Sequence, residues 1–220
     1  VTGVQTCALR ISVYGTTLPI AGVFANASTL DNAGEHLKLE DGQNQTILEF
    51  SYDDAAPWPT SPDGFGYTLV LKAPELKPDP TIAANWRASI FTGGTPGGSD
   101  ASILPVDPAG DANGNGEPDL LDYALGNDLG KPPILPSVTV QMNGGVADLR
   151  LHYPRSLGAD RAKIDVLYSA DMASWEDATP FLQAGTTQPL GDGRVMMHWA
   201  VKPPLADGAQ VYLRLRVTAQ

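Results

Sequence analysis

The residues with the clearest potential for chemistry lie in a short acidic stretch near the middle of the chain. Oxygen-bearing side chains recur there at alternate positions, and Gly116 follows the third of them. Calcium takes about six to eight oxygen ligands, which alternate residues of a tightly turning loop can direct toward one point. This pattern predicts a calcium site, and the alternative is a solvated acidic linker that binds no specific ion. The candidate ligands are Asp111, Asn113, Asn115, Glu117, Asp119 and Asp122.

The spacing of these residues resembles that of an EF-hand loop. Asp111 takes the first ligand position, Gly116 the sharp turn, and Glu117 the position that contributes a backbone carbonyl. The standard loop ends in a bidentate glutamate, whereas Asp122 stands here, as in dockerin-type loops. Asn115 replaces a more usual aspartate, so we expect weaker binding than in a standard loop. Single loops with proline-rich flanks are also similar to the calcium-binding repeats that join modules of secreted bacterial proteins.

The distribution of charge singles out the same stretch. The chain of 220 residues has a formal net charge of −11, and residues 101–130 hold six acidic and no basic side chains. Such a chain is poorly suited to bind nucleic acid, because affinity for the phosphate backbone depends on lysine and arginine. No apolar run reaches the roughly 18 to 20 residues that a membrane-spanning helix needs. A single cysteine provides neither a disulfide framework nor a thiolate metal cage.

The elements that would position the loop are short β-strands on both sides of it. Polar and apolar residues alternate in several segments, which are separated by turn sequences such as Asp41-Gly42. These segments predict antiparallel sheets of the sandwich or barrel type. A short helix ended by Gly126 is expected directly after the loop. The expected strands are residues 35–40, 46–52, 67–72, 137–142, 147–153, 164–169, 195–199 and 211–217.

Several motifs before the acidic stretch together resemble a bacterial lamin-tail domain, over about residues 12–100. The resemblance implies an immunoglobulin-like β-sandwich that serves as an accessory module of secreted or surface proteins. The motifs are Leu30-x-Asn32-x-Gly34-Glu35-x-Leu37-x-Leu39, Phe50-x-Tyr52, Trp58-Pro59, Asp63-Gly64-x-Gly66-Tyr67-Thr68-Leu69, Trp86-Arg87-x-Ser89 and Gly94-Thr95-Pro96-Gly97.

The C-terminal part is expected to form a second antiparallel β-domain. Its motif Tyr168-Ser169-x-Asp171-Met172-x-x-Trp175 resembles a C-terminal region common in large secreted bacterial proteins. The sequence therefore predicts an all-β protein in which a lamin-tail-type, immunoglobulin-like sandwich is joined to a second sandwich. The expected division is a lamin-tail-like sandwich at 12–100, a linker of calcium loop, short helix and proline-rich segment at 101–136, and the C-terminal domain at 137–220.

The first eleven residues are interpreted as an artefact. Residues 1–11 resemble the translation of a widely used short-read sequencing adapter, from which they differ at Arg10. We therefore exclude them from the fold and regard Cys7 as foreign to the protein. We also expect that upstream domains of the same protein are missing from the chain.

The remaining candidates are aromatic and histidine residues. Trp58, Trp86 and Trp175 could present a stacking platform for sugar rings, although packing in a small sandwich explains them as well. His152 and His198 could meet if their strands are neighbours, but two histidines without a third ligand make a poor zinc site. We find no nucleophile elbow or phosphate-binding loop, and no pair of carboxylates placed to face one another across a cleft.

These patterns favour a non-catalytic tail module of a larger secreted or cell-surface bacterial protein. A structural Ca²⁺ would rigidify the joint between the two β-domains, and a cell-envelope component or a polysaccharide could be a partner. The alternatives are a carbohydrate-binding module, or the C-terminal part of an extracellular hydrolase whose catalytic domain lies upstream. No catalytic residue is predicted.

Overall fold

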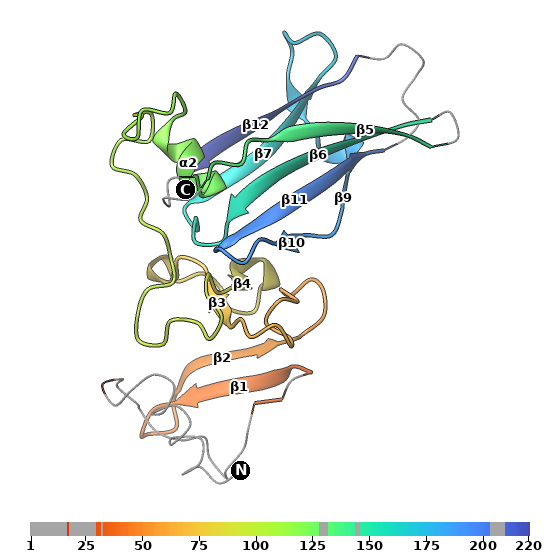
Figure 1. Ribbon diagram of the computed structural model, residues 1–220. Helices are drawn as coiled ribbons and strands as arrows, with labels where there is room; N and C mark the ends of the chain where they lie inside the picture. The colour runs from red at the N-terminus through yellow and green to blue at the C-terminus, as the bar shows by residue number, and fades with distance from the viewer. Residues whose placement is uncertain (1–16, 18–29, 32, 128–131, 144–145, 203–209) are drawn as a thin grey trace. The chain divides into compact units, whose positions relative to one another are not determined.

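Antiparallel β-strands, one short α-helix and three single-turn 3-10 helices (Pro74–Leu76, Ala83–Asn85 and Thr179–Phe181) form the regular structure of the part of the chain that the computed structural model describes (Figure 1). The prediction of an all-β protein is therefore confirmed. The structure describes residues 17, 30–31, 33–127, 132–143, 146–202 and 210–220, so the adapter-like segment lies outside the described residues. The chain divides into two compact units after Asp100. No helix of the described residues is long and apolar enough to cross a membrane.

The first unit contains two separate antiparallel pairs of strands. Asp41 forms the turn of the first pair, because its Oδ1 atom accepts hydrogen bonds from the backbone N–H groups of Gln43 and Gln45. The expected strand at 67–72 is confirmed over its centre, and one backbone hydrogen bond continues the pair on each side, from Ser89 to Thr68 and from Lys72 to Asn85. The pairs are β1 (Glu35–Glu40) with β2 (Thr46–Tyr52), and β3 (Leu69–Leu71) with β4 (Trp86–Ala88).

Two sheets make up most of the second unit. The first has the order β10-β11-β6-β5, with β9 pairing β11, and the second has the order β12-β7-β8. The first sheet consists of β5 (Ser137–Asn143), β6 (Val146–Ser156), β9 (Leu182–Ala184), β10 (Gln188–Pro189) and β11 (Arg194–Val201). The second consists of β7 (Ala162–Ser169), β8 (Glu176–Asp177) and β12 (Tyr212–Ala219).

Side chains of both sheets meet in one apolar core. Leu151 and Tyr153 of β6, Val166 of β7 and Val201 of β11 are all buried in it, because alternate residues of each strand point inward. Leu125 of the helix joins the same core. The segment expected as a linker therefore contributes buried residues to the second unit, and the structure places it from Ala101 onward in that unit.

Candidate metal centre

The helix α2 (Asp119–Leu125) fixes the end of the acidic loop to the second unit (Figure 1). Tyr123 and Leu125 are about 1% exposed, so one side of the helix is packed into the two apolar clusters of this unit. Gly126 adopts a φ of 75° and donates its N–H to the carbonyl of Asp122 at 2.7 Å, which ends the helix. The predicted short helix and its glycine stop are confirmed.

Asp122 is the most buried of the candidate ligands, at 1% exposure. Its Oδ2 atom accepts hydrogen bonds from the side-chain amides of Asn113, at 2.7 Å, and Asn115, at 2.9 Å. Its Oδ1 atom is buried and has no hydrogen-bond partner among the described residues. A buried oxygen left without a partner costs about 1 to 3 kcal/mol or more when charged, so this atom calls for a further ligand.

The rest of the loop is curled by side chains that accept hydrogen bonds from its own backbone. Asp111 accepts through Oδ1 from the N–H of Asn115, at 3.0 Å, and through Oδ2 from that of Gly116, at 2.9 Å. Asn115 Oδ1 accepts from the N–H of Glu117 at 2.7 Å. Gly116 has a φ of 90°, a conformation that other residues rarely adopt. The loop therefore turns at the position that the sequence predicts.

Asp119 closes the loop at the start of the helix. Its Oδ1 atom accepts a hydrogen bond from the N–H of Ala112 at 2.8 Å, and its own N–H donates to the carbonyl of Gly110 at 2.7 Å. The structure thus brings Asn113, Asn115 and Asp122 into direct contact. Asp111 and Asp119 hold the backbone of the same loop instead, and Glu117 is half-buried.

The side chains of this loop carry carboxylate and amide oxygens, the kind of ligand that a hard cation accepts. Within the described residues, no group of three or more His, Cys, Asp or Glu side chains is clustered so as to hold a metal ion. The groups that converge on Asp122 are amides, whose oxygens are ligands that calcium accepts alongside carboxylates. The amides of Asn113 and Asn115 now present nitrogen to the carboxylate, so a cation would require both to turn their oxygens inward.

The three candidate tryptophans belong to different units. In the first unit, Trp86 stacks on Phe50 at 5.2 Å between ring centroids and lies 5.9 Å from Trp58 at a tilt of 43°. The indole N–H of Trp86 donates to the carbonyl of Pro80 at 2.9 Å. Trp175 belongs to the second unit, where the guanidinium of Arg214 lies 4.2 Å from its ring centroid.

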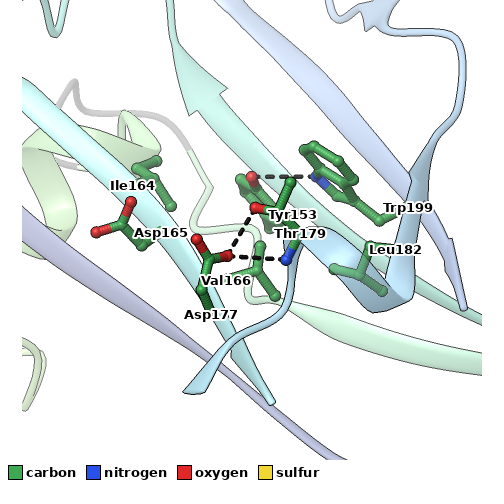
Figure 2. Close-up of a pocket in the computed structure, with 8 residues that line it drawn as sticks. All are labelled: Tyr153, Ile164, Asp165, Val166, Asp177, Thr179, Leu182 and Trp199. Atoms are coloured by element: carbon green, nitrogen blue, oxygen red, sulfur yellow. Dashed lines mark hydrogen bonds between the residues drawn. The ribbon is translucent and has the colours of Figure 1, made fainter. Parts of the chain in front are cut away.

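A small cavity lies at the edge of the core of the second unit. Figure 2 shows the indole N–H of Trp199 donating to the hydroxyl of Tyr153, at 3.2 Å, and Asp177 accepting from Thr179. The cavity measures about 80 Å³, whereas pockets for organic ligands measure about 300 to 1,000 Å³. It is lined by Tyr153, Ile164, Asp165, Val166, Asp177, Thr179, Leu182 and Trp199.

The two carboxyl groups beside this cavity are held ionised. Hydrogen bonds from Lys163 and Arg216 lower the pKa of Asp165, and the hydroxyl and N–H of Thr179 lower the pKa of Asp177. A general acid for glycoside hydrolysis needs a raised pKa instead. Neither carboxyl group of this pair therefore has the raised pKa that the general acid of such a reaction needs.

Comparison of the chain with models of protein families, with curated proteins and with solved structures found no match in any of the three.

Proposed function

We propose that the chain is a non-catalytic accessory module of a larger secreted or cell-surface bacterial protein, with a structural Ca²⁺ site in the loop from Asp111 to Asp122. The resemblance of residues 12–100 to a bacterial lamin-tail domain supports the accessory role and an immunoglobulin-like sandwich for the first unit. The predominance of antiparallel strands agrees with that interpretation.

The observation that carries the calcium site is the environment of Asp122. Its carboxylate is buried, one of its oxygens lacks a partner in the described part of the chain, and its other oxygen contacts only neutral amides. Residues 101–130 contain no lysine or arginine that could neutralise it from nearby in the sequence. A bound cation would supply both the missing ligand and the missing positive charge.

Six residues of the loop would coordinate the ion. Asp111, Asp119 and Asp122 would provide carboxylate oxygens, Asn113 and Asn115 amide oxygens, and Glu117 its backbone carbonyl. Calcium, when bound, would offset two of the negative charges of this stretch. Asp122 lies on α2, and α2 packs into the core of the second unit. Ion binding would therefore be coupled to the stability of that unit and to the rigidity of the segment after Asp100.

Calorimetry of the full chain with calcium and with chelator tests this proposal. At a free calcium concentration about 100 times Kd, one site adds about 2.7 kcal/mol, which raises Tm by about 10 °C for a unit of this size. Asp122→Asn should abolish the gain. Asp107→Asn, which removes the same charge from an exposed position in the same stretch, should keep it. Identical transitions of the wild-type chain under both conditions would show that no structural calcium site exists.

The alternative of a carbohydrate-binding module has weaker support. Trp58 and Trp86 lie together but are tilted, both are half-buried, and the N–H of Trp86 is used within the first unit. These features are typical of packing in a small domain. Tryptophan fluorescence measured against a panel of polysaccharides separates the two roles, because a saturable change that Trp58→Ala removes would favour sugar binding. A hydrolase domain upstream of this chain would be compatible with either role.

A further inference from the structure

Two histidines meet on the outer face of the five-stranded sheet. Leu151 and Tyr153, on either side of His152 in β6, are buried in the core, so the alternation of the strand sends His152 to the opposite face. The register of β11 against β6 places His198 directly opposite His152. Both side chains are half-buried. The two imidazoles are therefore held opposite one another by two neighbouring strands of the sheet.

The contact between the two rings is made through nitrogen. The two Nδ1 atoms lie 2.6 Å apart, and the ring planes meet at 74° with centroids 4.8 Å apart. The hydroxyl of Thr139, in β5, lies 2.9 Å from Nε2 of His152. With Nε2 donating its proton to Thr139, Nδ1 of His152 carries a lone pair directed at the other ring. A hydrogen bond from the far nitrogen of the ring, as in this tautomer, orients histidines that bind metals.

Backbone that directly follows β9 restricts His198, because Gly185 donates its N–H to the carbonyl of His198 at 2.8 Å. A Cβ atom at position 185 would lie 3.1 Å from that of His198.

We propose that His152 and His198 form a second cation site, a two-histidine site for a divalent transition-metal ion, and that Cu²⁺ is its preferred occupant. The site is separate from the calcium loop and takes a different class of ion, since imidazole nitrogens suit copper, nickel and zinc whereas carboxylate and amide oxygens suit calcium. Thr139 is a positioning residue that fixes the tautomer of His152. Water completes the coordination of the ion.

The separation of the nitrogens favours copper over zinc. Metal–nitrogen bonds of about 2.0 Å at the right angles of a square-planar ion place two adjacent nitrogens about 2.8 Å apart, whereas tetrahedral angles place them about 3.3 Å apart. The observed 2.6 Å is closer to the square-planar value. Small rotations of the two rings would direct the Nδ1 lone pairs of both histidines toward a copper ion placed to one side of the line that joins the nitrogens. Copper is also the divalent ion of highest affinity for a given nitrogen site.

The test is a titration of the full chain with Cu²⁺ in the presence of saturating calcium, followed by calorimetry and electron paramagnetic resonance. All variants carry Cys7→Ser, which removes the single thiol. His152→Gln and His198→Gln each remove one proposed ligand. The matched control is His36→Gln. His36 is the third histidine of the chain, and its Nε2 atom lies 3.0 Å from Oε1 of Glu49.

We expect one copper ion per chain with two equatorial imidazole nitrogens in the resonance spectrum. His152→Gln and His198→Gln should each weaken copper binding at least tenfold. Loss of a residue that only hydrogen-bonds to a metal ligand already costs about tenfold or more in affinity, and loss of a ligand itself should cost no less. His36→Gln should bind as the parent does. Two imidazole couplings in the parent spectrum support the site even where a variant fails to fold. A spectrum with one or no imidazole, or an equal loss of affinity in His36→Gln, would overturn the proposal.

Discussion

Among the described residues, each unit buries one aspartate, and the two aspartates are compensated in different ways. Asp100 in the first unit and Asp122 in the second both have an Oδ1 atom without a hydrogen-bond partner in the described part of the chain. Asp100 nevertheless has a counter-charge, because its Oδ2 atom lies 2.7 Å from Nη1 of the buried Arg87 and also accepts the N–H of Ile90 at 3.0 Å. The contacts of Asp122 are to the neutral amides of Asn113 and Asn115.

This difference separates two features. A buried oxygen without a hydrogen-bond partner is a weak indication of a metal site, whereas a buried carboxylate without a neighbouring positive charge is a stronger one. A buried carboxylate is tolerated when a guanidinium lies against it with good geometry. Asp100 meets that condition within its own unit, so it requires no ion. Asp122 has no positively charged group among the contacts that the described residues make with it, and it lies in a stretch without lysine or arginine. The comparison therefore predicts that the first unit is indifferent to calcium and the second is not.

The largest effect is expected from removing the counter-charge of Asp100. Arg87→Met leaves that carboxylate buried without a cation, which costs about 3 to 5 kcal/mol. The free energy of unfolding of the first unit, measured by hydrogen exchange of peptides from each unit during urea unfolding, should fall by that amount with or without calcium. Arg150→Met is the matched control, because it removes an exposed partner of Asp148 and should cost about 0 to 1 kcal/mol.

Equal losses for the two arginine variants would break the comparison, since they would mean that Asp100 tolerates burial without its guanidinium. In that case the burial of Asp122 would no longer require a cation either.

A smaller effect, with opposite signs in two conditions, is expected from Asn115→Asp. Without calcium the change replaces a donor to Asp122 Oδ2 by a like charge, and it should lower the stability of the second unit by about 1.5 to 3 kcal/mol, the value of a hydrogen bond to a charged group. With calcium the added carboxylate should raise the affinity for the ion, measured by isothermal titration. Asn44→Asp, an exposed change of equal charge in the first unit, should do neither. A loss of stability that calcium leaves unrelieved would contradict the proposed site.

Much of the fold and of the loop could be predicted from the sequence because both depend on local patterns. Alternation identified the strands that contain His152 and His198, and turn chemistry identified the bend at Gly116. The helix from Asp119 followed from its apolar residues and its glycine stop. Each of these features is decided by residues within a few positions of one another.

Features that depend on contacts between distant residues were not predicted. Arg87 and Asp100 are thirteen residues apart, and no sequence pattern links the one to the other. The register of β11 against β6, which brings His198 opposite His152, depends on which residues of both strands fill the core. The short strands β8, β9 and β10 consist of two or three residues and have no periodicity to detect. The strand positions of the two histidines did indicate that they could meet if their strands were neighbours, and the register shows that they do.

The smallest expected effect is a dependence of stability on pH that arises from the histidine pair. Because burial lowers the pKa of His152 in the folded chain, the folded state takes up a proton there less readily than the unfolded state. Its contribution to stability is thus complete above the ordinary histidine pKa of about 6.5 and is lost as the pH falls below it. The Tm of the second unit, measured in chelator, should decrease between about pH 7 and pH 5.

His152→Gln should flatten that decrease, whereas His36→Gln should leave it unchanged. This result extends the comparison of the two aspartates to a cationic group. A positive charge on His152 would lie two residues from Arg150, and the carboxylate of Asp148 is already bonded to Arg150. An unchanged slope in His152→Gln would mean that protons bind the pair without a cost to the fold. The two imidazoles would then be free to separate, and the geometry on which the copper site depends would not persist in solution.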